Sequence, residues 1–123
     1  MTNVIITGAS RGIGFAIADI FARNGCNLFI TSQNDIKLYK AVETLQTRYN
    51  NIEVRAKAFD LSNKEQALAF GEWCLAQCAP DILVNNTGVF EPGNISEEAD
   101  GALERQIATN LYSAYHVTRS LLP

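Results

Sequence analysis

The sequence predicts an α/β fold in which helices cover both faces of a parallel sheet, and two observations indicate it. Short apolar runs rich in β-branched residues alternate with longer segments whose apolar residues recur every three or four positions. The connections between successive apolar runs are too long for hairpins, so the runs are expected to pair in parallel through helical crossovers. With 123 residues and no repeat or linker, residues 1–123 are expected to form one domain.

Four segments have the length and composition of buried strands, at residues 4–6, 26–31, 52–59 and 81–84. Right-handed crossovers between them give the strand order 3-2-1-4. This is the nucleotide-binding half of a Rossmann-type, doubly wound sheet. The chain as given is expected to stop before the fifth strand of such a sheet.

Helical periodicity separates these strands. The first helix is expected to end near Gly25, a good left-handed cap, and to bury a face made of Ile13, Ile17, Ile20 and Phe21. Asn34 or Asp35 is expected to cap the second helix. The Ser-Asn-Lys-Glu segment at 62–65 reads as a capping box for the third. A long helix over 103–122 is expected to present one apolar face, consisting of Leu103, Ile107, Leu111, Ala114, Thr118 and Leu121.

The first strand runs directly into a glycine-rich turn, Thr-Gly-Ala-Ser-Arg-Gly-Ile-Gly at residues 7–14, and a helix follows. Unpaired N–H groups and the positive end of the helix dipole make such a turn suited to a phosphate. Gly8 permits the tight turn, Gly12 the close approach of the anion, and Gly14 the contact between helix and strand. The alternative is a turn without a ligand, because glycine clusters commonly follow strands.

Polar segments also follow the other three strands, at 31–34, at Asp60–Leu61 and at 85–88. In doubly wound sheets, ligands bind outside the carboxyl ends of the strands, next to the switch point between strands 1 and 4. The joint placement of these segments with the glycine turn therefore predicts one nucleotide site. Taken singly, Asp60 has the alternative role of capping the next helix, and Asn86 that of satisfying strand backbone groups.

The turn at 7–14 resembles the N-terminal signature of the short-chain dehydrogenase/reductase family, in its simple single-domain form. The Asn-Asn-Thr-Gly segment at 85–88 is similar to the Asn-Asn-Ala-Gly element of that family, with Thr in place of Ala. The resemblance extends over all 123 residues and is strongest to bacterial 3-oxoacyl-(acyl-carrier-protein) reductase-like members. It implies a nicotinamide dinucleotide cofactor, with these residues expected around it: Gly8, Ser10, Arg11, Gly12, Ile13, Gly14, Ser32, Gln33, Asp60, Leu61, Asn86, Thr87 and Gly88.

The resemblance also implies individual roles. Asp60 matches the acidic residue that receives the adenine amino group, with the Leu61 backbone beside it. Asn86 matches the residue that ties the central sheet together. Asn110 matches the helix asparagine of the catalytic set, which supports the catalytic group through a water-linked proton relay.

The choice between NADP and NAD depends on the end of the second strand. A carboxylate there would accept the two hydroxyls of an NAD ribose and repel a 2′-phosphate, but Ser32 and Gln33 offer none. Arg11 can pair with a 2′-phosphate through a charge-assisted contact. These residues favour NADP, although Asp35 weakens the argument, and Arg11 has the alternative reading of a solvated loop residue.

Members of the family transfer hydride between the nicotinamide and a carbonyl or alcohol carbon, using a serine, a tyrosine and a lysine four residues after the tyrosine. In the family these residues lie beyond the next strand, so the chain as given is expected to be inactive alone. Tyr115 and Arg119 have the right separation but precede the fifth strand, and Arg is a poor substitute for the lysine. The alternative function is a non-catalytic dinucleotide-binding or interaction module.

Composition limits the partners. A net charge of −3 gives no electrostatic footprint for nucleic acid or an anionic membrane, and no apolar stretch is long enough to span a bilayer. Three cysteines without framework spacing indicate reduced thiols in a cytoplasmic protein. Cys74 and Cys78, four residues apart on the expected third helix, could contact a metal together, but zinc generally needs four ligands and His116 is the only histidine. We expect a small-molecule carbonyl or alcohol substrate, either free or linked to acyl carrier protein. We also expect a homo-oligomer, because the fourth strand would be an open edge.

Overall fold

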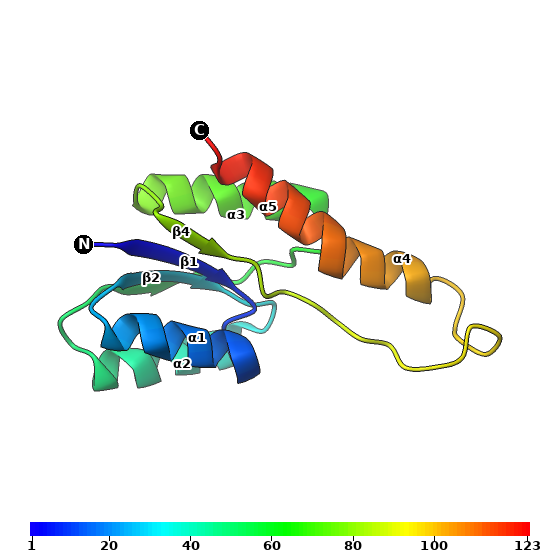
Figure 1. Ribbon diagram of the computed structural model, residues 1–123, viewed down its shortest axis with the longest axis horizontal. Helices are drawn as coiled ribbons and strands as arrows, with labels where there is room; N and C mark the ends of the chain where they lie inside the picture. The colour runs from blue at the N-terminus through cyan, green and yellow to red at the C-terminus, as the bar shows by residue number, and fades with distance from the viewer.

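The computed structural model describes all residues 1–123, and four strands form one parallel sheet in the order β3-β2-β1-β4 (Figure 1), as the sequence predicts. The strands are β1 (Asn3–Thr7), β2 (Asn27–Thr31), β3 (Val54–Ala56) and β4 (Ile82–Val84). The helices are α1 (Gly12–Arg23), α2 (Asp35–Arg48), α3 (Lys64–Gln77), α4 (Ala102–Ile107) and α5 (Ser113–Leu121), with a π-helical turn, η1 (Ala108–Tyr112), between the last two. None of these helices is both long enough and apolar enough to cross a lipid bilayer.

Helices cover both faces of the sheet, with α1 and α2 below it and α3 and α5 above it in Figure 1. Alternate residues of β1 therefore enter two separate cores. Val4 and Ile6 pack with residues of α1 and α2, whereas Ile5 packs with residues of α3 and α5. Because β1 is buried on both sides, its sequence is a continuous apolar run rather than an alternating one.

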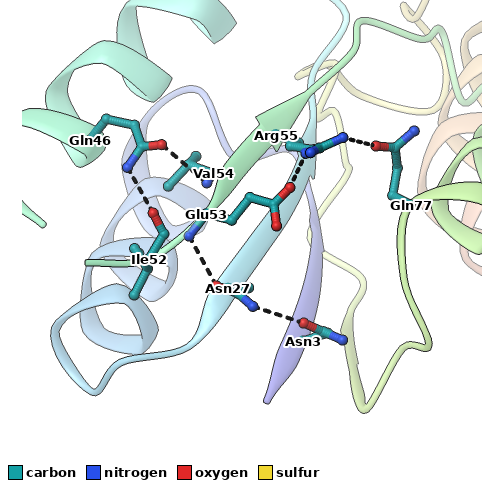
Figure 2. A network of polar contacts seen from close by, with 8 residues as sticks. All are labelled: Asn3, Asn27, Gln46, Ile52, Glu53, Val54, Arg55 and Gln77. Atoms are coloured by element: carbon teal, nitrogen blue, oxygen red, sulfur yellow. Dashed lines mark hydrogen bonds and ion pairs between the residues drawn. The ribbon is translucent and has the colours of Figure 1, made fainter. Parts of the chain in front are cut away.

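Polar side chains tie the amino ends of neighbouring strands together (Figure 2). Asn27 donates from Nδ2 to Asn3 Oδ1 at 3.2 Å and accepts the backbone N–H of Glu53 at 2.9 Å. Arg55 pairs with Glu53 and donates to Gln77 Oε1 of α3 at 2.8 Å. These contacts connect β1, β2 and β3 at the amino ends of the strands. The glycine turn lies at the opposite, carboxyl ends, so the contacts do not occupy the predicted site.

The helix ends agree with the sequence in two places and differ in one. Gly25 follows α1 with φ +82°, and the Asn34 side chain caps α2 by accepting the N–H of Lys37 at 3.0 Å. The expected capping box beginning at Ser62 is wrong, because Asn63 is the cap of α3 and accepts the N–H of Gln66 at 3.1 Å. The Ser62 side chain is engaged elsewhere, in the site described below.

The buried face of α1 also differs from the expected one. Its buried residues are the small ones, Gly14, Ala18 and Ala22, whereas Ile13 and Ile20 are 73% and 50% exposed. Small side chains let the helix axis approach the sheet closely, and the larger apolar residues are displaced toward its flanks. Ile17 and Phe21 of the expected face do pack against the core, so the prediction is confirmed for these two residues and wrong for Ile13 and Ile20.

The long helix is interrupted, which the sequence did not predict. The π-helical turn η1 lies between α4 and α5, and such a turn adds a residue that rotates the following side chains around the axis. Ser113 and Val117 are the buried residues of α5, while Leu103 and Leu111 of the expected apolar face are exposed.

The crossing of α3 and α5 depends on a glycine, and this generates a stability prediction. A Cβ on Gly71 would lie 2.7 Å from Ser120 Cβ, and closer still to its hydroxyl. In an open helix Gly→Ala stabilises by up to about 1 kcal/mol. At this crossing we expect Gly71→Ala to lower the free energy of unfolding by about 1–3 kcal/mol instead, measured by urea denaturation. In a Ser120→Gly background the same substitution is expected to stop destabilising; a loss of equal size there would contradict the steric explanation.

Candidate functional site

A cleft of about 470 Å³ lies at the carboxyl ends of the strands, where the sequence predicts the nucleotide site. It brings together the glycine turn, the end of β2, the segment after β3 and the segment after β4. Every residue expected around the cofactor lines this cleft except Gly14. The lining consists of Gly8, Ser10, Arg11, Gly12, Ile13, Thr31, Ser32, Gln33, Phe59, Asp60, Leu61, Ser62, Asn86, Thr87, Gly88, Val89 and Thr109.

The glycine turn has the backbone that an anion site needs. Gly8 and Gly12 have φ values of +63° and +58°, a region that disfavours other residues. A Cβ on Gly12 would meet no atom within 4 Å, so the turn is open on that side. No side chain caps α1: Arg11 occupies the cap position in an extended conformation without a side-chain hydrogen bond. The first N–H groups of α1, which have no partner within the helix, therefore remain available beside the cleft.

Gly14 lies behind the turn rather than in the cleft. A Cβ there would be 2.6 Å from Asn86 Nδ2 and closer still to the Gly8 carbonyl oxygen. The first turn of α1 thus packs directly against the backbone at the end of β1. This is the contact between helix and strand for which the sequence predicts a glycine.

Thr7 connects the end of β1 to the segment after β4. Its buried hydroxyl oxygen accepts the N–H groups of Asn86 and Thr87 at 2.9 and 3.1 Å. Asn86 in turn donates from Nδ2 to the Gly8 carbonyl oxygen at 3.1 Å. The hydrogen bonds of Thr7 and those of Asn86 therefore both connect the end of β1 to the segment after β4.

The end of β2 is polar and uncharged. Ser32 donates from its hydroxyl to Ser10 Oγ at 3.0 Å, across the space between β2 and the glycine turn. Gln33 is exposed at the same end of the cleft. Arg11 is the only cation and Asp60 the only carboxylate in the lining, and they come from different wall segments.

Asp60 is held in a defined orientation. Its Oδ1 accepts the backbone N–H of Ser62 at 3.1 Å and the Ser62 hydroxyl at 2.6 Å. Its own N–H donates to Gln66 Oε1 at 2.7 Å, while Oδ2 has no hydrogen-bond partner in the protein. Since Asn63 caps α3, Asp60 is not the helix cap. One oxygen of a carboxylate that lines the cleft therefore remains free to accept a hydrogen bond.

Asn110 lies in η1 and contacts the segment after β4. Its Oδ1 accepts the N–H of Val89 at 2.6 Å, and its Nδ2 donates to the Val89 carbonyl oxygen at 2.8 Å. Both side-chain groups are thus used to hold one residue of the loop. Asn110 itself does not line the cleft, although its neighbours in sequence and space, Thr109 and Val89, do.

The loop between β4 and α4 projects away from the sheet (Figure 1) and is held at a second point. Arg105 donates from Nε and Nη2 to the two carboxylate oxygens of Glu91, both at 2.9 Å. This charge-assisted contact lowers the pKa of Glu91 from its ordinary value of 4.5 and raises that of Arg105. The Asn110 and Glu91 contacts together fix the side of the loop nearest the cleft.

Other candidate groups lie elsewhere. Tyr115 accepts a hydrogen bond from Arg119 at 3.2 Å on α5, and neither residue lines the cleft. Burial raises the pKa of the Cys74 thiol to about 12, which disfavours the reactive thiolate. No three of the His, Cys, Asp and Glu side chains come together in a way that would hold a metal ion.

The family model for short chain dehydrogenases matches residues 2–123. The chain belongs to the short-chain dehydrogenase family. The resemblance seen in the segments at 7–14 and 85–88 is thus confirmed.

Two curated relatives indicate how much of a family member the chain represents. The oxidoreductase UcpA of Salmonella typhimurium is 34% identical over 122 residues, which are 98% of this chain and 45% of that protein. A very-long-chain 3-oxoacyl-CoA reductase of Caenorhabditis elegans is 35% identical over 104 residues, covering 82% of this chain and 33% of that protein. The chain therefore spans less than half the length of these relatives.

Two solved structures have the same fold. L-Sorbose reductase from Gluconobacter frateurii, complexed with NADPH and L-sorbose, matches with a TM-score of 0.91 and 30% identity, over 98% of this chain and 46% of its own. An alcohol dehydrogenase from Thermococcus sibiricus, complexed with 5-hydroxy-NADP, matches with a TM-score of 0.93 and 29% identity, over 98% of this chain and 52% of its own. The doubly wound fold and its strand order are confirmed.

Several residues that line or support the cleft are not among those the sequence predicts. Thr7 is expected only as the start of the glycine turn, although a polar residue at the buried end of an apolar strand signals a hydrogen-bonding role. Ser62 and Val89 directly follow recognised segments, so a wider window would have included them. Nothing in the sequence places Thr109 at the cleft, because its position depends on how η1 packs.

The Thr7 hydroxyl is expected to be important for stability. Thr7→Val preserves shape but leaves the N–H groups of Asn86 and Thr87 without their acceptor. We expect a loss of about 1–3 kcal/mol in the free energy of unfolding, measured by denaturant titration. Thr7→Ser, which keeps the acceptor, is expected to retain more of the stability. The matched control is Thr44→Val, whose hydroxyl donates to a carbonyl on the exposed side of α2. Equal effects at the two threonines would contradict the role assigned to Thr7.

The Glu91–Arg105 contact predicts a pH-dependent loop. Because the folded-state pKa of Glu91 is lowered, the contact stabilises the fold above the ordinary pKa and is lost as pH falls through the lower folded value. We expect amide protection of residues 89–91, corrected for intrinsic exchange, to fall between about pH 5 and pH 3. The Glu91→Gln variant is expected to show weak protection at both pH values. The Glu98→Gln variant is the control and is expected to show the same pH dependence as the unsubstituted protein. A flat profile in the unsubstituted protein would contradict the prediction.

Proposed function

We propose that residues 1–123 bind NADP(H) in the cleft at the carboxyl ends of the strands. The observation that carries this proposal is the uncapped first turn of α1, which opens on the same cleft as the ends of β2, β3 and β4. Backbone N–H groups at a helix N-terminus accommodate a pyrophosphate without a cationic side chain. Solved relatives complexed with NADPH or an NADP derivative support the choice of cofactor.

Different residues of the cleft would then contact different parts of the dinucleotide. The backbone at Gly12 and Ile13 would hold the pyrophosphate, and Ser10, Ser32 and Gln33 would surround the ribose at the end of β2. The adenine would lie against the segment after β3, where Asp60 Oδ2 is free to accept its amino group. The nicotinamide half would extend along the segment after β4, where it would contact Asn86, Thr87 and Gly88.

We further propose that the whole protein is an NADP(H)-dependent oxidoreductase acting on a small carbonyl or alcohol compound. The bound nicotinamide supplies or accepts the hydride. The named activities of similar structures, reduction of L-sorbose and dehydrogenation of alcohols, support this substrate class. In that reaction Asn110 would act by positioning, because both of its side-chain groups hold Val89 at the edge of the cleft.

Residues 1–123 alone are proposed to bind the dinucleotide without turning it over. None of their four tyrosines has a lysine four residues later, and the nearest equivalent, Tyr115 with Arg119, lies outside the cleft. A neutral tyrosine has a pKa near ~10 and needs a positive neighbour for acid–base catalysis near neutral pH. Dinucleotide binding is therefore the activity to measure on this chain.

Fluorescence titration with NADPH tests the proposal, and an adenine-specific variant makes it sharper. We expect saturable binding that Asp60→Ala weakens by about tenfold, the effect of losing one charge-assisted hydrogen bond. The same substitution is expected to leave binding of the hypoxanthine analogue of NADPH nearly unchanged, because that base carries a carbonyl in place of the amino group.

Asp100→Ala is the matched control, since this exposed loop residue lies outside the cleft. Absence of NADPH binding by a correctly folded chain would overturn the proposed function. Equal losses for the adenine and hypoxanthine forms would overturn only the role of Asp60.

A further inference from the structure

The connection between β3 and α3 is arranged around Asp60. The N–H of Asp60 donates to Gln66 Oε1 at 2.7 Å, and its carbonyl oxygen accepts the N–H of Asn63 at 3.1 Å. Its carboxylate oxygen Oδ1 accepts both the N–H and the hydroxyl of Ser62, at 3.1 and 2.6 Å. Every polar atom of Asp60 except Oδ2 is therefore engaged by a residue in or just before the first turn of α3.

The helix cap of α3 holds the backbone of Asp60. Asn63 accepts the N–H of Gln66 at its side-chain oxygen and the N–H of Ala67 at its carbonyl oxygen, at 3.1 and 2.9 Å. In a capping box, the side chain three residues after the cap bonds back to the N–H of the cap residue itself. The Gln66 side chain reaches the N–H of Asp60 instead. The start of α3 and the position of the Asp60 backbone therefore depend on each other.

Ser62 is the only residue that holds the carboxylate group of Asp60. The last torsion of an aspartate side chain is soft, because the carboxylate rotates in a broad, roughly two-fold potential. Two donors on Oδ1 restrict that rotation, and the hydroxyl contact has the length of a strong charge-assisted hydrogen bond. No cation shares this task, since the three ion pairs of the protein involve other carboxylates.

The Ser62 hydroxyl itself also lines the cleft, so positioning of Asp60 has to be distinguished from a direct contact with a ligand. Its proton is used in the hydrogen bond to Asp60 Oδ1. A serine hydroxyl has a single proton, so only acceptor capacity is left for a ligand. The structure therefore gives Ser62 a stronger interaction with Asp60 than any that it can offer as a donor to the cleft.

We propose that Ser62 is a positioning residue for recognition of the adenine, because its hydroxyl fixes the Asp60 carboxylate with Oδ2 free for the exocyclic amino group. The proposal rests on the proposed function, since it requires the adenine to lie against the segment after β3. It assigns the discrimination between an amino and a carbonyl group on the base to Asp60 and Ser62 together. A base with a carbonyl oxygen at that position would place two acceptors against each other.

A double-mutant cycle measured with two dinucleotides tests this role. The variants are Ser62→Ala, Asp60→Ala and their combination, each titrated with NADPH and with its hypoxanthine analogue. We expect Ser62→Ala to weaken NADPH binding by about three- to tenfold and to change binding of the analogue by less than about twofold. In the Asp60→Ala background the same substitution is expected to have no further effect, because the carboxylate that Ser62 positions is absent.

Two further variants separate this role from a general one. Ser62→Thr keeps the hydroxyl and is expected to retain most of the NADPH affinity. Ser96→Ala is the matched control, because Ser96 is exposed on the loop before α4 and lies outside the cleft, and it is expected to leave both affinities unchanged. Circular dichroism of Ser62→Ala is expected to match that of the unsubstituted chain, since the cap of α3 is Asn63.

The outcomes distinguish this inference from the function on which it rests. If Ser62→Ala binds NADPH as tightly as the unsubstituted chain, or loses both dinucleotides equally, the role of Ser62 is overturned while the proposed function stands. A further loss of NADPH affinity in the Asp60→Ala background would indicate direct contact with the ligand and would also overturn positioning. If the folded chain binds neither dinucleotide, the inference and the proposed function are both overturned.

Discussion

The structure depends on the contact at which β1, α1 and the segment after β4 meet. Gly14 packs against the Gly8 carbonyl group, and Asn86 donates to the same carbonyl oxygen. A side chain at either glycine would separate these backbones, because Cβ atoms there would lie within 3 Å of neighbouring atoms. Thr7 holds the third element in place from the buried side. The glycines thus serve the packing of the three elements as much as the binding of an anion.

That contact also explains why the cleft has two chemically different ends. It fixes the glycine turn between the end of β2 on one side and the segment after β4 on the other, following the strand order β3-β2-β1-β4. Arg11, the only cation of the lining, lies at the glycine turn, while Asp60 provides a free acceptor at the segment after β3. The cation and the free carboxylate oxygen of the cleft therefore come from different wall segments.

The sequence predicts those features of the fold and of the site that depend on local chemistry. It does not predict the features that depend on how side chains pack. Spacing of Gly8, Gly12 and Gly14 predicted the turn because only glycine satisfies those backbone positions. The expected face of α1 is only partly right: Ile17 and Phe21 pack against the core, but the helix approaches the sheet through small residues, and Ile13 and Ile20 are exposed. The cap of α3 was also wrong: Ser62 fits the capping pattern, but its hydroxyl bonds to Asp60.

The π-helical turn η1 interrupts the apolar periodicity expected for the long helix at the point where the helix contacts the candidate site. A regular helix through residues 108–112 would continue the phase expected from Leu103 and Leu111, but it would also aim Asn110 in a different direction. The π-helical turn instead places both polar groups of Asn110 on the backbone of Val89, and it brings Thr109 to the cleft. Such turns sacrifice regular hydrogen bonding, so they persist where they create a contact that a regular helix cannot make. The interruption of the long helix therefore lies where that helix contacts the wall of the cleft.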